Sequence, residues 1–166
     1  NGFSKDIKIL KKENEGAASA RNLGIHNSNG SYIAFLDSDD VWHPEKIEKQ
    51  VQLMNEKHLD LVYCGGESFG HIGLPTMYAP EFSGDCYRRF REFPTKAIII
   101  LGCSSAIIRK SILEFSGDFD TKFLGAAEDW DFFRRICKYG KVGFLKENLV
   151  KYRLHDTNVS TRGIKD

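Results

Sequence analysis

An apolar run that stops abruptly at a cluster of acids constrains the fold of this chain most. Residues 32–36 are continuously apolar, which is typical of a strand buried on both faces of a sheet. The run ends at Asp37, and Asp39 and Asp40 follow directly. Because ligands of open parallel sheets bind beyond the carboxyl ends of the strands, the pattern predicts a ligand site at this edge.

Strand and helix patterns alternate around this run. Residues 7–10 and 59–64 are predicted strands, and the second is expected to end at Gly65-Gly66. A helix is predicted over residues 17–26, and another begins near Pro44 and should bury Ile47, Val51 and Met54. The order strand, helix, strand, helix, strand predicts a mostly parallel sheet with helical crossovers.

The second half of the chain continues the α/β pattern after an irregular stretch over residues 67–95. Residues 105–109 are a predicted strand and residues 110–115 a short helix. A helix over residues 128–138 should bury Trp130, Phe133 and Cys137, and strands are predicted at 142–145 and 149–154. We therefore expect one α/β domain, a mostly parallel sheet flanked by helices.

Composition excludes several classes of function. Lys and Arg number 24 against 23 Asp and Glu, so no global charge favours nucleic acid. The longest wholly apolar run, residues 97–101, is too short to cross a bilayer. The four cysteines form no C-x-x-C pair, which favours reduced thiols over a metal or disulfide framework and predicts a cytoplasmic location.

The acids after residue 36 suit a divalent cation. In an extended backbone Asp37 and Asp39 point to the same side, and a cation such as Mg²⁺ or Mn²⁺ is the usual way to hold such carboxylates together. The alternative is a solvated acidic turn in which Asp40 caps the next helix. A calcium loop of the EF-hand type is excluded because Trp42 occupies its glycine position.

Four stretches together resemble the inverting glycosyltransferases of family 2, which have the GT-A fold. Residues 14–25 resemble the N-x-G-x-x-x-A-R-N-x-G segment of that family, and residues 35–40 its F-L-D-x-D-D motif. Glu128-Asp129 resembles the E-D motif, and residues 152–155 with Ser160 resemble Y-R-x-H…S. The resemblance implies that residues 1–166 are one catalytic domain, incomplete at its N-terminus because the family's first β-α-β unit is absent.

The resemblance also implies roles for individual residues. Asp37 and Asp39 would bind the nucleotide sugar, with Asp39 and His155 holding Mn²⁺ or Mg²⁺. Arg21 would reach the diphosphate or the base, although an arginine on a helix is otherwise a solvated residue. Asp129 would be the general base, since inversion needs a carboxylate to take the acceptor's proton, and Glu128 would bind the acceptor.

Three functions are therefore weighed for this chain. The first is metal-dependent transfer of a sugar, with inversion, from a UDP-sugar or similar donor to a glycan or lipid-linked glycan, in cell-surface polysaccharide or lipopolysaccharide synthesis. It implies peripheral association with the inner face of a membrane and no nucleic acid partner. The second is a binding module without turnover. The third, a nucleotidyltransferase, would need a glycine-rich phosphate loop that the sequence does not show.

Overall fold

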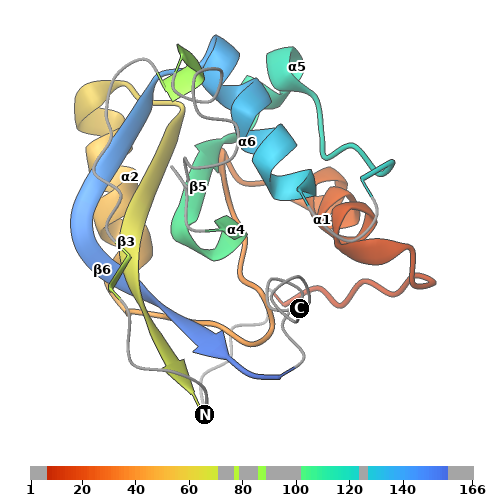
Figure 1. Cartoon of the computed structure of the whole chain (residues 1–166). Coiled ribbons are helices and arrows are strands. Elements are labelled where there is room, and N and C mark those ends of the chain that lie inside the picture. The colour runs from red at the N-terminus through yellow and green to blue at the C-terminus, as the bar shows by residue number, and fades with distance from the viewer. Residues whose placement is uncertain (1–6, 71–76, 79–85, 89–101, 124–126, 157–166) are drawn as a thin grey trace.

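A mixed β-sheet with helices on both faces organises the protein (Figure 1). The computed structural model describes residues 7–70, 77–78, 86–88, 102–123 and 127–156. The strands are β1 (Tyr32–Ala34), β2 (Val41–Trp42), β3 (Leu61–Gly70), β4 (Met77–Tyr78), β5 (Ala106–Arg109) and β6 (Val142–Leu154). The helices are α1 (Gly16–Asn27), α2 (Lys46–Lys57), α4 (Gly102–Ser105), α5 (Leu113–Ser116) and α6 (Glu128–Tyr139), with a 3-10 turn η1 (Lys110–Ile112).

The order of strands corrects the expectation of a mostly parallel sheet. The order is β1-β5-β3-β6-β2, with β4 on β3, and β3–β6 is the one parallel pair within the described residues. Strand β5 runs antiparallel to both β1 and β3, so β1 and β3 point the same way but are not neighbours. The crossover through α2 was predicted correctly in direction. The strand at β5 was also predicted, but its insertion between β1 and β3 was not.

Two predicted strand boundaries are wrong for a common reason, a bulge between β3 and β6. β3 does not end at Gly65-Gly66, and the two late strands are one strand, β6. The register jumps from Cys64↔Leu145 to Gly65↔Asn148 and then to Gly66↔Val150. The extra residues of β6 interrupt its apolar pattern, although the strand continues through them.

The predicted first strand, residues 7–10, is also wrong. These residues form no strand, and the side chains of Ile7 and Ile9 are 63% and 79% exposed. Residues 7–10 therefore neither pair with a strand of the sheet nor bury their apolar side chains. The helix that follows, the strand β1 and the helices α2 and α6 lie where the sequence predicted them.

Alternation of side chains divides the core between the two faces of the sheet. Leu61, Tyr63 and Ile108 face α1 and α6, where they join one large buried cluster. Val62 and Ile107 point the opposite way and pack on Met54 of α2. Period-two alternation in β3 and β5 thus places α2 on one face and the helices α1 and α6 on the other (Figure 1).

The buried face of α2 is partly polar, which differs from the predicted stripe. Met54 is buried as expected, but Ile47 is 36% exposed, and Lys46 and Gln50 are fully buried instead. The Gln50 amide donates to the carbonyl oxygens of Val62 and Ser105, so it satisfies backbone acceptors of the sheet. Lys46 Nζ donates to Gln50 Oε1 at 2.8 Å and lies 4.3 Å from the centre of the Trp42 ring.

The buried stripe of α6 was predicted in part. Phe133 and Cys137 are buried, while Trp130 is only half-buried against the core. Phe132 and Ile136, which are completely buried, carry the rest of the contact. The Phe132 ring stacks on Phe119 with centroids 3.8 Å apart, so α6 is packed onto the segment that precedes it.

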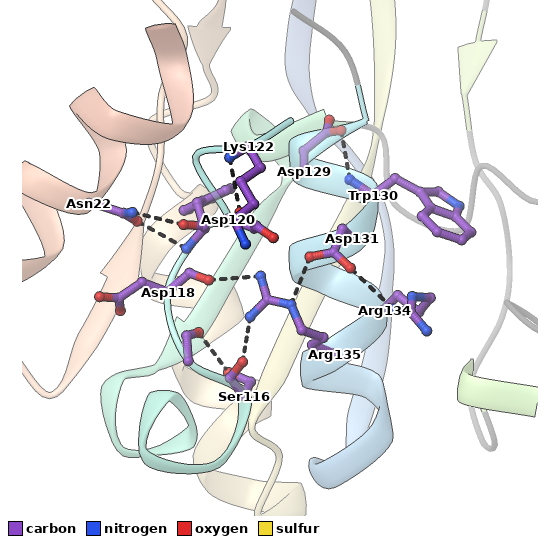
Figure 2. A network of polar contacts seen from close by, with 12 residues as sticks. Asn22, Ser116, Asp118, Asp120, Lys122, Asp129, Trp130, Asp131, Arg134 and Arg135 are labelled. Atoms are coloured by element: carbon purple, nitrogen blue, oxygen red, sulfur yellow. Dashed lines mark hydrogen bonds and ion pairs between the residues drawn. The ribbon is translucent and has the colours of Figure 1, made fainter. Parts of the chain in front are cut away.

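That segment, residues 116–122, is tied to two helices by polar contacts (Figure 2). Asn22 of α1 accepts from the Phe119 N–H at 3.0 Å and donates to the Phe119 carbonyl at 2.9 Å. Arg135 of α6 donates to the carbonyl oxygens of Ser116 and Asp118 and pairs with Asp131 at 2.7 Å. Asp131 therefore has a structural role, and these contacts link α6 to α1 through the segment between them.

In the part of the chain that the structure describes, no helix has both the length and the apolar character needed to cross a membrane.

Stability should depend on pH through Lys46. Burial lowers the pKa of Lys46 from 10.5 to about 8, so between these values the unfolded chain binds a proton that the folded protein does not. The free energy of unfolding of the wild type, relative to Lys46→Met, should therefore rise by about 3 kcal/mol between about pH 7 and pH 11. Urea unfolding of both proteins across this range measures the difference. Lys49→Met, on the exposed side of α2, should show no such rise, and a pH-independent difference for Lys46→Met would contradict the assignment.

Asn22→Ala should destabilise the protein by about 2 kcal/mol, because both backbone groups of the half-buried contact at Phe119 lose their partner. Asn27→Ala on the same helix removes a bond to the Leu23 carbonyl of its own helix and an exposed contact with Lys8, and should lose clearly less. Thermal and urea unfolding compare the two variants. Equal losses would mean that the Asn22 contact adds nothing beyond an ordinary helix hydrogen bond.

Candidate active site

The acids after β1 form a turn, here called the carboxylate loop (residues 37–40). The Asp40 N–H donates to the Asp37 carbonyl at 3.1 Å, which closes the turn. The expected extended backbone is therefore wrong, and Asp37 and Asp39 bind different partners instead of pointing together by alternation. Asp40 is 8% exposed, and its carboxylate accepts the N–H of Arg153 at 3.1 Å. It does not cap α2, because β2 intervenes and Glu45 precedes the helix.

Helix α4 holds this loop by hydrogen bonds at Ser104. The Asp37 N–H donates to Ser104 Oγ at 3.1 Å, and the Trp42 indole donates to the Ser104 carbonyl at 2.8 Å. Burial raises the pKa of Asp40, and its hydrogen bonds to Ser104 and to the Arg153 backbone partly offset this. Ser104 therefore supports the carboxylate loop. Its role as a support depends on a contact across 67 residues, which no local pattern signals.

Asp39 and His155 come together although they are 116 residues apart in sequence. Asp39 Oδ2 and His155 Nε2 are 2.9 Å apart, and each side chain is 33% exposed. Arg153 Nε also donates to the Asp39 carbonyl at 2.9 Å. The end of β6 therefore brings two candidate metal ligands to the rim of the site, as the sequence predicted for their positions.

The pair fits a divalent cation as two ligands of a larger set. In an octahedral site with metal–oxygen distances of about 2.1 Å, adjacent ligand atoms lie about 3.0 Å apart, close to the spacing of this pair. No group of three or more His, Cys, Asp or Glu side chains within the described residues is arranged to hold a metal. A cation here would therefore take its other ligands from substrate oxygens and water, as Mg²⁺ commonly does.

Arg21 joins the carboxylate loop to the start of α6. Its guanidinium donates to Asp37 Oδ1 and to Glu128 Oε1, both at 2.8 Å, and lies 5.5 Å from the centre of the Phe119 ring. The side chains of Arg21 and Glu128 are each 15% exposed. Of the two alternatives for Arg21, a solvated helix residue is therefore excluded. Within the described residues these contacts engage two of its five N–H groups.

A groove of about 520 Å³ between α1 and β1 reaches this arginine. The small residues Ala17, Ala20 and Gly24 of α1 line it, and Arg21 and Asp37 stand in its wall. A ligand can thus approach the guanidinium along the side of α1 that carries these small residues.

The start of α6 holds Asp129 in a half-buried position. Ala127, just before the helix, has a φ of 72°, an uncommon backbone conformation for a residue with a Cβ. Asp129 Oδ1 accepts the Trp130 N–H at 2.7 Å. Burial raises the pKa of Asp129, and the charge of Glu128 raises it further, while the Trp130 N–H and Arg21 act in the opposite direction.

The structure adds the thiol of Cys103 to the predicted residues. Cys103 on α4 is 1% exposed, and burial holds its pKa well above the ordinary value, so it is a neutral group. It lies close enough to interact with Arg21, Asp37, Glu128 and Asp129. It therefore adds an uncharged, buried group beside these four charged side chains.

Comparison with known proteins places this arrangement in a family. The chain is 30% identical over 159 residues to TuaG of Bacillus subtilis, a glycosyltransferase named for teichuronic acid biosynthesis, with 92% of this chain and 58% of TuaG covered. It is 26% identical over 164 residues to WfgD of Escherichia coli, with 96% of this chain and 60% of WfgD covered. WfgD is named as a UDP-Glc:α-D-GlcNAc-diphosphoundecaprenol β-1,3-glucosyltransferase.

A solved structure shows the same fold. The crystal structure of TarS 1–349 of S. aureus in complex with UDP-GlcNAc matches with a TM-score of 0.71 and 18% identity, over 92% of this chain and 43% of that one. The GT-A fold expected from the sequence is thereby confirmed. The chain spans 22–60% of the lengths of the curated relatives that it matches.

The family described as Glycosyl transferase family 2 matches residues 2–115, a span that includes α1 and the carboxylate loop. This chain belongs to glycosyltransferase family 2.

Proposed function

We propose that this domain transfers a sugar, with inversion, from a nucleotide diphosphate donor to an acceptor hydroxyl. One observation carries the proposal: Arg21 and Glu128, 107 residues apart, and Asp39 and His155, 116 residues apart, meet around one carboxylate loop. Membership of the family supports the class of reaction. The neighbour TarS, solved with UDP-GlcNAc and with UDP, supports a UDP-sugar as the donor.

In the proposed reaction Asp129 takes the proton of the acceptor hydroxyl. The freed oxygen attacks the anomeric carbon from the side opposite the diphosphate, the bond to the diphosphate oxygen breaks, and the nucleoside diphosphate leaves with that electron pair. A carboxylate with a raised pKa accepts a proton more readily than an ordinary aspartate, which suits this step. Glu128 stands beside Asp129, where an acceptor hydroxyl would be bound.

The donor's diphosphate needs positive charge that the protein can supply from two sides. Arg21 retains N–H groups beyond those used by Asp37 and Glu128 and can donate them to phosphate oxygens. Asp39 and His155 would hold Mn²⁺ or Mg²⁺, which when bound offsets the charge that develops on the leaving diphosphate. Asp37, paired with Arg21, would then face the nucleotide half of the donor.

The acceptor in this proposal is a glycan or a lipid-linked glycan of the cell surface. The names of TuaG and WfgD, a teichuronic acid enzyme and an enzyme acting on a diphosphoundecaprenol-linked sugar, support this class. A lipid-linked acceptor would bring the protein to the inner face of a membrane as a peripheral component.

Asp129→Asn should lower the turnover number by a factor of about 10²–10⁴ while leaving the affinity for the donor unchanged, because the amide cannot take the proton. Release of UDP measures turnover in the complete protein, and calorimetry with the UDP-sugar measures binding. Asp118→Asn, an acid-to-amide change at a half-buried carboxylate that pairs with His26, should keep near-normal turnover. Undiminished transfer by Asp129→Asn would refute the assignment of the base.

Chelation should abolish transfer, and added Mn²⁺ should restore it. His155→Ala should then raise the Mn²⁺ concentration needed for half-maximal activity by about tenfold or more, because one of two protein ligands is lost. Mn²⁺ binding followed by electron paramagnetic resonance in the presence of UDP gives the affinity directly. His26→Ala, which removes an exposed imidazole paired with Asp118, is the matched control. Full activity in the presence of EDTA would contradict a metal at Asp39 and His155.

A further inference from the structure

Three carboxylates and one guanidinium share the centre of the site. Arg21 contacts Asp37 on one side and Glu128 on the other, and Asp129 follows Glu128 directly on α6. Asp37 is 40% exposed at its side chain, whereas Glu128 is 15% exposed, so the contact with Glu128 is the less hydrated of the two. Like charges in such a setting raise one another's pKa unless a cation stands between them.

The charged and titratable groups that act on Asp129 come from every element around it. Glu128 lies on its own helix, Arg21 on α1, Asp37 on the carboxylate loop and the neutral thiol of Cys103 on α4. The two acids favour the protonated form of Asp129, and Arg21 alone favours the ionised form by its charge. The Trp130 N–H adds a fixed hydrogen bond to the ionised form.

We propose that Arg21 is a positioning residue that sets the proton affinity of the base: it holds Glu128 and Asp37 as its partners and keeps their negative charge from acting in full on Asp129. This inference rests on the proposed function for its meaning in catalysis. Without Arg21 the carboxyl of Asp129 would face two uncompensated acids and would stay protonated to higher pH. The protonated carboxyl cannot act as a base.

Arginine suits this position for a geometric reason. The two acids belong to different elements, and the planar guanidinium reaches one with NH1 and the other with NH2. A lysine at the same place carries a point charge on a flexible stem and offers no fork that fixes both carboxylates. The charge of Arg21 would then remain, but the separation of the three acids would be less well fixed.

The same arginine serves the donor without releasing the acids. Its N–H groups not used by Asp37 and Glu128 can reach phosphate oxygens, so binding of the donor need not break the contacts that control Asp129. The base can then be in the correct protonation state before the donor arrives.

The titration midpoint of the Asp129 carboxyl carbon, followed by ¹³C NMR in the absence of substrate, tests the proposal. The signal is assigned by its loss in Asp129→Asn. Arg21→Met should raise the midpoint by about one pH unit, and Glu128→Gln should lower it, because one variant removes the compensating cation and the other removes an acid. Arg21→Lys should give a smaller rise. Arg109→Met, which removes an arginine from the far end of β5, should leave the midpoint in place.

The opposite signs of the two variants distinguish electrostatic positioning from a general loss of structure. An unchanged or lowered midpoint in Arg21→Met, or an unchanged one in Glu128→Gln, would overturn the proposal. If Arg21→Met does not fold, the direction of the Glu128→Gln midpoint decides alone. The NMR midpoints do not depend on turnover, so failure of the base assignment would appear separately, as retained activity of Asp129→Asn. If both hold, the acid limb of kcat/KM should move with the NMR midpoint.

Discussion

The contact of Arg21 with Asp37 and Glu128 is the interaction on which the rest of the site depends. It joins the first helix to the turn after β1 and to the start of α6, and thus links the two halves of the chain. The next residue, Asn22, binds the Phe119 backbone that leads into α6. Two consecutive side chains of one motif therefore do different work, since one balances charge and the other fixes the position of the backbone.

A second link, from β6 to the carboxylate loop, depends on the bulge opposite Gly65 and Gly66. The register along β3 skips Lys146, Glu147 and Leu149. If these three residues were paired one-to-one in the ladder, the end of β6 would lie about 10 Å further along the sheet, and every following side chain would point to the other face. Arg153 and His155 would then miss the loop that they contact. Because of this bulge the sequence pattern indicated two strands where there is one. The same bulge brings the imidazole of His155 to Asp39.

The parts of the fold that the sequence predicted are those set by local periodicity, such as α1, α2, β1 and α6. The insertion of β5 between β1 and β3 was missed because strand pairing is a non-local choice. The buried face of α2 was misplaced for another reason: Gln50 enters the core to satisfy carbonyl groups of Val62 and Ser105, which are invisible until the sheet is built. In the site, motifs pointed to candidate residues, but the partner of each, such as Glu128 for Arg21, follows only from the tertiary structure.

The half-buried position of Asp129 makes its ionised form destabilising to the folded protein. A carboxyl whose pKa is raised by burial binds its proton more tightly in the folded than in the unfolded chain, so its contribution to stability is lost as pH rises through that raised pKa. Above it, the folded protein holds an ionised acid beside Glu128. Arg21 offsets this repulsion with a single charge that is itself mostly removed from water. The same contact therefore limits the repulsion among these acids and favours the ionised form of Asp129, which is the form that the proposed base would need.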